Sequence, residues 1–199
     1  IANQGEGRLE MMATLALGEP ERCAYELERA VDLYGARSAI LPTTAGGRPL
    51  DGPEFDVLFT VAERLGLLLF MHPVSAEAPS RFPLYGVQVL VQWPFETTLA
   101  VTRMIFEGIF DRHPGLQLLL AHGGGNLIFL KGRLNSAYEA TGWEADPYYR
   151  KNISKAPGDY FQQIFFDTCS LSAESVDFTI QSVGADRVMF GTDYPFDIG

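Results

Sequence analysis

Three side chains that can bind a metal ion or transfer a proton each close a short apolar segment. His72 ends LLLFMH, His122 ends LQLLLAH and Asp193 ends VMFGTD. They lie too far apart in the chain for a local zinc motif, whose ligands are only a few residues apart. One such histidine is usually a hydrogen-bonded structural residue. Three polar groups with the same placement favour a site assembled from separate parts of the fold.

The segments that hold these residues repeat one pattern, in which a helix and a glycine turn precede a short apolar strand. The strand segments are hydrophobic throughout and do not alternate, which is typical of a parallel sheet covered by helices. Because the carboxyl ends of parallel strands meet at one edge, His72, His122 and Asp193 are expected to face a common site. Helices are expected at 20–35, 53–66, 95–110 and 172–184, and strands at 11–17, 36–41, 67–72, 116–122, 163–168 and 188–193.

This alternation predicts an α/β fold, either a doubly wound sheet or a (β/α)8 TIM barrel. A barrel normally has eight strands in roughly 250 residues, whereas about six strands fit in the 199 residues here. A barrel would therefore lack about two of its strands. No low-complexity segment interrupts the pattern, so residues 1–199 are expected to form a single domain.

The overall composition argues against some partners. The net charge of −10 disfavours binding to nucleic acid or to an anionic membrane surface. No apolar run approaches the roughly 20 residues that a membrane helix requires. Cys23 and Cys169 are far apart and form no C-x-x-C motif, so a reducing, cytoplasmic location is expected rather than a disulfide framework.

Three other features bear on the site. Asp167 lies at the end of another strand segment, FFDT, and is expected beside the site, where it would orient a ligand or hold a neighbouring loop. The three glycines after His122 match neither phosphate-binding glycine motif, so they are expected to allow a sharp turn. His113 precedes a strand in DRHPG, so it should lie at the opposite edge in a structural or exposed role.

Two features lie further from the strand ends. Arg133 falls in the helix expected after His122. A helix-surface arginine is usually just solvated, but a guanidinium is also the best clamp for a carboxylate. Residues 141–163 have no clear apolar periodicity and are expected to form a partly helical excursion, either a lid or a subunit contact.

The motifs FMHP, LAHGGG, FFDT and VGADRVMFGTDYPF occur in this order along the chain. Together with WPFETTLAVTRMIFEGIFDRHPGLQLLLAHGGG, they resemble the amidohydrolase superfamily. The resemblance is to its metal-dependent decarboxylases, typified by aminocarboxymuconate semialdehyde decarboxylase, and covers about Ala13 to Gly199. It implies a distorted (β/α)8 barrel with one divalent metal ion, usually zinc and sometimes manganese.

Residue roles follow from this resemblance alone. His72 and Asp193 match metal ligands on the fifth and eighth strands of the family. His122 matches a histidine that acts in acid/base chemistry beside the metal, and Asp193 could also accept a proton there. Arg133, in the motif GRL, matches an arginine that in relatives can reach a carboxylate across a subunit interface. A homodimer is implied only by this resemblance.

One part of the family pattern does not occur in the sequence. The first strand of the family carries an H-x-H or E-x-H ligand pair, and no H-x-H is present here. Counting back from His72 as the fifth-strand residue places the first two βα units before Ile1. The last helix would follow Gly199. The chain is therefore expected to represent a partial barrel.

Three functions remain open. The first is a metal-dependent non-oxidative decarboxylase for a small aromatic or unsaturated carboxylic acid. In that enzyme His122 would move a proton near neutral pH and Arg133 would hold a second anionic group. The second is a metal-dependent hydrolase or hydratase of the same fold. The third is a non-catalytic remnant, because two protein ligands hold zinc poorly.

Overall fold

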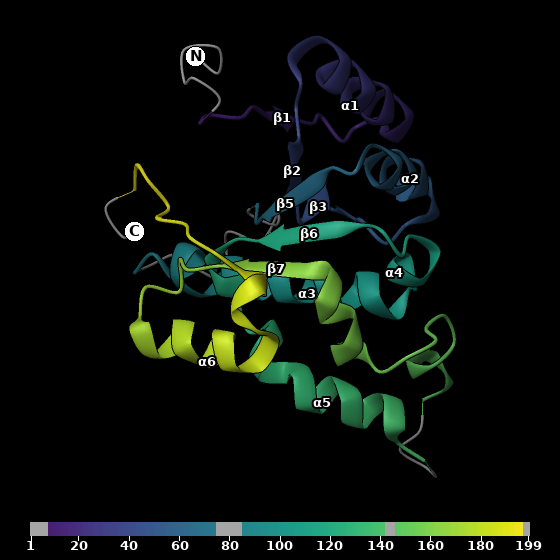
Figure 1. The fold of residues 1–199 in the computed structure, drawn as a ribbon. Coiled ribbons are helices and arrows are strands. Elements are labelled where there is room, and N and C mark those ends of the chain that lie inside the picture. The colour runs from purple at the N-terminus through teal and green to yellow at the C-terminus, as the bar shows by residue number, and fades with distance from the viewer. Residues whose placement is uncertain (1–7, 75–84, 142–145, 197–199) are drawn as a thin grey trace.

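The main sheet has six strands, all of them parallel, in the order β1-β2-β5-β6-β7-β8. These are seen in a computed structural model, which describes residues 8–74, 85–141 and 146–196. The strands lie side by side with helices packed against them (Figure 1). They are β1 (Met12–Thr14), β2 (Ser38–Pro42), β5 (Leu68–His72), β6 (Gln117–Leu120), β7 (Ile164–Asp167) and β8 (Val188–Met189).

The order of the strands identifies the type of α/β fold. Each strand pairs with the next main-sheet strand along the chain, without the reversal of order that defines a doubly wound sheet. A parallel sheet that grows in one direction through helical connections is the arrangement of a (β/α)8 barrel. The described residues form a six-stranded arc of such a barrel, as the sequence predicts.

Helices connect the successive strands, and their ends follow local sequence signals. Pro20 begins α1 in the first turn, where proline costs no hydrogen bond, and Gly35 ends that helix with a φ of 65°. Gly66 ends α2 in the same way. Among the described residues, none of the helices is long and apolar enough to cross a membrane. The helices are α1 (Pro20–Tyr34), α2 (Asp56–Leu65), α3 (Trp93–Phe106), α4 (Ile109–Arg112), α5 (Leu127–Glu139) and α6 (Ala173–Val183), and β3 (Thr44–Ala45) pairs with β4 (Arg48–Pro49) as a small hairpin.

The two faces of the sheet are buried to different degrees. Successive side chains on a strand point to opposite faces. Leu69 and Leu120 are fully buried. Phe70 and Leu119 point the other way, pair directly across β5 and β6, and are only half-buried. The hydrophobic core therefore lies on one face of the arc, and the other is the face that a barrel turns toward its axis.

The last strand is shorter than the sequence predicts. The apolar pattern indicates a strand from Val188 to Asp193, but β8 ends at Met189. Phe190 is 87% exposed, so the chain leaves the sheet several residues before it reaches Asp193. The carboxylate is thus carried by irregular chain beyond the strand and not by the strand end itself. The first strand, β1, is also shorter than its predicted segment.

Residues 146–163 join the end of α5 to the start of β7, so they lie at the edge where the strands begin. Two 3-10 helices occur here, Pro147–Tyr149 and Pro157–Gln163, as expected for a partly helical excursion. Tyr160 is almost completely buried. The segment is therefore part of the packed fold and is not a lid over the opposite edge. Residues 142–145 of the predicted excursion lie outside the described residues.

Candidate metal centre

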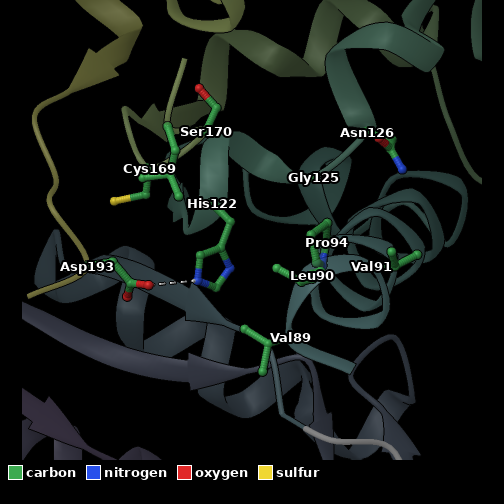
Figure 2. Close-up of a pocket in the computed structure, with 11 residues that line it drawn as sticks. Val89, Leu90, Val91, Pro94, His122, Gly125, Asn126, Cys169, Ser170 and Asp193 are labelled. Carbon is green, nitrogen blue, oxygen red and sulfur yellow. Dashed lines mark ion pairs between the residues drawn. The ribbon is translucent and has the colours of Figure 1, made fainter. Parts of the chain in front are cut away.

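The carboxyl edge of the sheet brings together the three side chains that the sequence singles out. His72 is the last residue of β5, His122 follows β6 after Ala121, and Asp193 lies beyond β8. One potential ligand atom from each of the three lies within 4.8 Å of the others. Figure 2 shows His122 and Asp193 facing each other, with Nε2 of the histidine 3.9 Å from Oδ2 of the aspartate. Three separate segments thus converge on one point.

The surroundings of His72 determine which of its ring nitrogens is free. Nδ1 lies 3.0 Å from the backbone oxygen of Pro73. A carbonyl oxygen can only accept a hydrogen bond, so Nδ1 donates, and in the neutral ring Nε2 then has the lone pair. A backbone carbonyl on one ring nitrogen is a common way to orient a histidine that binds metal through the other.

His122 is held in its neutral form. Burial lowers the pKa of this histidine, and the neighbouring His72 lowers it further, while the carboxylates of Asp193 and Asp167 act in the opposite direction. Its Nδ1 is buried and has no hydrogen-bond partner among the described residues. A neutral imidazole with a free nitrogen can bind a metal ion or accept a proton.

The donor set suits a divalent transition metal. Imidazole nitrogen is a good ligand for zinc, and carboxylate oxygen is a ligand for both zinc and manganese. Metal–ligand bonds of about 2.0–2.2 Å place the ligand atoms within roughly 4 Å of one another. The three donor atoms already lie within 4.8 Å. Small side-chain movements would therefore be enough to surround an ion.

The three glycines after His122 are required by close packing as well as by the turn. All three have positive φ values, between 63° and 72°. A Cβ atom on Gly124 would lie 2.6 Å from the Phe166 ring, and one on Gly125 would lie 2.1 Å from the backbone oxygen of Pro94. The turn is thus pressed between β7 and α3, which agrees with the predicted sharp turn.

Unfavourable backbone conformations gather at the same place. Four described non-glycine residues have positive φ: His122 and Asp193 at 56°, Leu171 at 60° and Tyr85 at 64°. The first three line one cavity. The left-handed conformation costs a non-glycine residue about 1–2 kcal/mol. Such residues persist where surrounding contacts enforce them, and they cluster at functional sites.

A cavity of about 410 Å³ lies in front of His122 and Asp193. Val89 and Leu90 supply an apolar part of its wall, from the π-helix Gln88–Gln92 that precedes α3 (Figure 2). The volume falls within the range of about 300–1,000 Å³ that is usual for small-molecule sites, which are mostly apolar with a few polar groups. The cavity can hold a small flat molecule beside the donor atoms.

Asp167 lies beside this site, at the end of β7. Its carboxylate is buried and accepts three backbone hydrogen bonds. The donors are the amides of His122 at 3.2 Å, Gly123 at 2.7 Å and Cys169 at 3.0 Å. The aspartate therefore holds the turn that carries His122.

The sequence profile of the amidohydrolase family matches residues 2–198 of the chain. The chain belongs to the amidohydrolase family. Among curated proteins, this amidohydrolase is 33% identical over 196 residues to 2-amino-3-carboxymuconate-6-semialdehyde decarboxylase of Dictyostelium discoideum. That alignment covers 98% of this chain and 52% of the relative. The resemblance drawn from the motifs is confirmed.

Solved structures share the fold. For 5-carboxyvanillate decarboxylase of Sphingomonas paucimobilis the TM-score is 0.86 at 26% identity, covering 98% of this chain and 58% of that one. A second structure is a mutant of 5-carboxyvanillate decarboxylase from Novosphingobium aromaticivorans, with bound manganese and 3-methoxy-4-hydroxy-5-nitrobenzoic acid. Its TM-score is 0.85 at 25% identity, and the match covers 98% of this chain and 57% of that one. This amidohydrolase spans about half of the length of the Dictyostelium relative and somewhat more of these two proteins.

Two residues of the amidohydrolase site have no assigned role in the sequence pattern. The Trp93 ring, at the start of α3, lies 6.1 Å from the His122 ring at an angle of 19° and 6.0 Å from the His72 ring. Cys169 lines the cavity, and burial raises the pKa of its thiol to about 12, so the thiol stays protonated. An aromatic residue before proline in WPFE is the only local signal for Trp93, and none exists for Cys169.

Two predicted residues lie away from the site. Arg133 is exposed on α5 and does not line the cavity, so it does not meet the other candidates within one chain. His113 is buried at the opposite edge of the sheet. Its ring nitrogens lie 3.1 Å from a carboxylate oxygen of Asp56 and 3.4 Å from one of Glu63. The structural role predicted for His113 in this amidohydrolase is confirmed.

Proposed function

We propose that this amidohydrolase is a metal-dependent non-oxidative decarboxylase that acts on a small aromatic or unsaturated carboxylic acid. The observation that carries the proposal is the convergence of His72, His122 and Asp193 beside one cavity. The relative and the solved structures described above are named as decarboxylases, which supports this reaction. Metal-binding donors beside an apolar wall suit a flat acid that approaches the metal through an oxygen atom.

His72 and Asp193 would hold the metal ion. His72 would present Nε2, because its Nδ1 is engaged by the Pro73 carbonyl. Asp193 would present a carboxylate oxygen, which lies within 4.8 Å of the histidine donor atoms. When bound, a divalent ion supplies Lewis-acid chemistry by withdrawing electron density from a coordinated substrate oxygen.

His122 would move the proton. When the carbon–carbon bond breaks and CO2 leaves, the electron pair remains on the substrate carbon, which must then gain a proton. Because its pKa is lowered, His122 is neutral near pH 7 and can accept a proton from an acidic group of the substrate. It can then donate that proton to the carbon. Val89, Leu90 and Trp93 would limit the access of water to this transfer.

Release of CO2 tests this function directly. The full-length protein would be assayed with a panel of hydroxybenzoates and enoic carboxylates, with metal present and after chelation. We expect CO2 release that requires metal and that is lost in His122→Ala. Opening of a lactone substrate without any CO2 release would replace the proposal with a hydrolase or hydratase of the same fold.

Zinc is the metal that we propose first, with manganese as the alternative. The imidazole proposed as a ligand, that of His72, favours zinc. The manganese bound in the Novosphingobium structure favours the alternative. Rates of CO2 release after adding back each metal at equal occupancy would decide between them, and a faster rate with manganese would replace zinc.

A non-catalytic protein is the second candidate, and one observation favours it. The sequence has three histidines and no H-x-H pair. Catalytic zinc sites use about three protein ligands, and His122 cannot serve as ligand and proton carrier together. Metal analysis separates the two candidates. Stoichiometric zinc or manganese supports the enzyme, and failure to retain either after reconstitution supports the non-catalytic protein.

We also propose that Arg133 works across a homodimer, reaching a carboxylate bound by the partner subunit. Phe129 lies one helical turn from Arg133 on α5 and is 79% exposed. Phe95 and Leu99, one turn apart on the neighbouring helix α3, are also exposed. Large exposed apolar side chains on adjacent helices are typical of protein–protein contacts. The proposed interface therefore contains the arginine.

Subunit complementation tests the role of Arg133. Arg133→Ala and His122→Ala would each be inactive, and the two proteins would then be mixed and allowed to exchange subunits. If the arginine acts across the interface, one of the two sites in each mixed dimer is intact and activity returns. If it acts within its own subunit, every site keeps one defect and the mixture stays inactive. Light scattering would establish whether a dimer forms.

A further inference from the structure

We infer that the end of β7 is a brace that sets the geometry of the candidate site. Asp167 is the last residue of β7 and Thr168 follows it. The two side chains bind the segments on opposite sides of the strand. The inference rests on the proposed function in one respect only, that His122 and Asp193 must lie at a fixed separation to work.

On one side, Asp167 holds the turn after β6. Oδ1 accepts a hydrogen bond from the amide of Gly123 at 2.7 Å, and Oδ2 accepts one from the amide of His122 at 3.2 Å. His122 has a φ of 56° there, which a non-glycine residue adopts only under constraint. Charge-assisted hydrogen bonds to a buried carboxylate are strong enough to supply that constraint. The direction of the His122 side chain thus depends on Asp167.

On the other side, Thr168 holds the chain after β8. Its Oγ1 donates a hydrogen bond to the backbone oxygen of Gly191 at 2.9 Å and accepts one from the Gly191 amide at 3.1 Å. β8 has already ended at Met189, so no strand pairing holds this part of the chain. The Thr168 hydroxyl therefore takes the place of the two backbone hydrogen bonds that a sheet would supply to Gly191. Gly191 lies two residues before Asp193.

The segments approach each other closely at Gly191, where an added Cβ atom would need its neighbours to move by a few tenths of an ångström. A Cβ atom there would lie 3.1 Å from Sγ of Cys169 and 3.3 Å from Cβ of Asp167. The chain after β8 is thus packed directly against the end of β7. Because the same strand end holds both neighbours, it sets the 3.9 Å separation of His122 and Asp193. Asp167 and Thr168 are positioning residues, since neither side chain needs to touch the substrate.

Two nearly isosteric variants remove the brace one side at a time. Asp167→Asn replaces one acceptor oxygen with an NH2 group, so at least one backbone amide loses its acceptor. Thr168→Val removes both hydrogen bonds with Gly191. Asp111→Asn is the matched control for the acid, because Asp111 is hydrogen-bonded at the opposite edge of the sheet. Thr179→Val is the control for the threonine, because Thr179 is a buried residue bonded only within α6.

Amide hydrogen exchange in the full-length protein reports the brace without any need for activity. Loss of one hydrogen bond should speed exchange about tenfold at the amide concerned. We expect this at Gly191 in Thr168→Val and at His122 in Asp167→Asn, with neither amide affected in the controls. The His122 amide is the one expected to lose its acceptor, because the asparagine oxygen can still accept the two amides bound at Oδ1. Unchanged exchange at both amides in the two variants would overturn the inference.

Cobalt(II) binding then shows whether the brace positions the site. Thr168→Val should lower Co²⁺ affinity about 10- to 100-fold, because it frees the chain that carries the proposed ligand Asp193, as loss of an outer support does in other metal sites. Both variants should change the visible absorption spectrum of bound Co²⁺, because each moves one of the two side chains beside it. They should lower kcat and leave KM nearly unchanged. The controls should lower only the thermal midpoint. Equal Co²⁺ spectra in all four variants would show that Asp167 and Thr168 have only a structural role, and would overturn the inference that they position the site.

The outcome is independent of the reaction assigned to the protein. A wild-type protein that binds Co²⁺ but releases no CO2 refutes the proposed decarboxylase and still reports the effect of each variant on the metal spectrum. A wild-type protein that does not bind Co²⁺ refutes the metal site, and with it the claim that the brace positions metal ligands.

Discussion

The two edges of the parallel sheet contain the same kinds of side chain in opposite states. At the edge where strands begin, His113 lies between Asp56 and Glu63, with a carboxylate near each ring nitrogen. At the edge where strands end, His122 has a buried nitrogen without a partner among the described residues. Its other ring nitrogen, Nε2, lies 3.9 Å from Oδ2 of Asp193. At the first edge both histidine nitrogens have carboxylate partners, whereas at the second edge the histidine and aspartate atoms remain available to bind a ligand.

This difference shows that two residues of the same type have different roles because they lie at different places in the fold. Buried polar groups are normally hydrogen-bonded, and a satisfied network stabilises the fold. Buried groups left without partners cost stability and are kept where a ligand will use them. The amino edge therefore stabilises the protein, and the carboxyl edge is available for chemistry.

One aspartate from each edge provides the largest contrast. Asp193→Asn should lower metal affinity and activity by more than about 100-fold, since loss of an outer partner alone costs about 10- to 100-fold. Asp56→Asn should retain the metal and lower the thermal midpoint, because it weakens the bonds from Arg112 and His113. Metal analysis and thermal unfolding measure both. Loss of metal in Asp56→Asn would remove the distinction between the edges.

One glycine from each edge compares the backbone. Gly125→Ala would place a Cβ atom 2.1 Å from the backbone oxygen of Pro94 at a φ of 63°. Overpacking and left-handed strain together should cost about 3 kcal/mol or more. Gly66→Ala, at the end of α2, meets nothing within 4 Å and should cost only the backbone strain of about 1–2 kcal/mol. Urea unfolding measures both, and equal losses would contradict the tighter packing of the site turn.

One histidine from each edge compares satisfied with unsatisfied side chains. His113→Leu should lower the free energy of unfolding by about 1–3 kcal/mol, because two carboxylates each lose one of their hydrogen-bond partners. His122→Leu should have little effect on stability, because its buried Nδ1 has no partner to lose. Activity should follow the opposite order, with CO2 release lost only in His122→Leu. A large loss of stability in His122→Leu would show that the carboxyl edge is also structural.

The smallest expected effect is on the pH dependence of stability, where His122 and Asp56 should act in two different pH ranges. Burial lowers the pKa of His122 below 6.5. Between the folded and unfolded values the unfolded chain binds more protons, so stability falls as the pH falls through this window. For Asp56, burial raises the pKa, but hydrogen bonds from Arg112 and His113 outweigh it and lower the pKa below 3.8. Asp56 therefore adds to the free energy of unfolding above pH 3.8, and this stabilisation is lost as the pH falls through the pKa that Asp56 has in the folded protein.

Urea unfolding as a function of pH checks these windows. His122→Leu should flatten the profile just below pH 6.5 and leave the acidic part unchanged. Asp56→Asn should flatten only the part below pH 3.8. A profile for His122→Leu that matches the wild type in the first window would show that another group is its source.

Local signals were enough to predict most of the secondary structure. Pro20, Gly35 and Gly66 mark helix ends through their own backbone preferences, which hold wherever the segment lies. The predicted strand at 188–193 was too long, because its apolar composition does not reveal that β7 stops pairing with it at Met189. Strand length depends on a neighbour that is distant in the sequence.

By itself, the sequence determined that His72, His122 and an acidic residue follow apolar segments of a parallel sheet. That was sufficient to predict a common edge, because parallel strands all end on the same side. Apart from the family resemblance, which implies a barrel, only the tertiary structure decided between a barrel and a doubly wound sheet, since strand order is set by packing between distant segments. The same holds for the ring of Trp93 beside both histidines and for the hydrogen bonds of Thr168 to Gly191. Each depends on a contact between residues that are far apart in the sequence, and the sequence around one residue does not indicate the other.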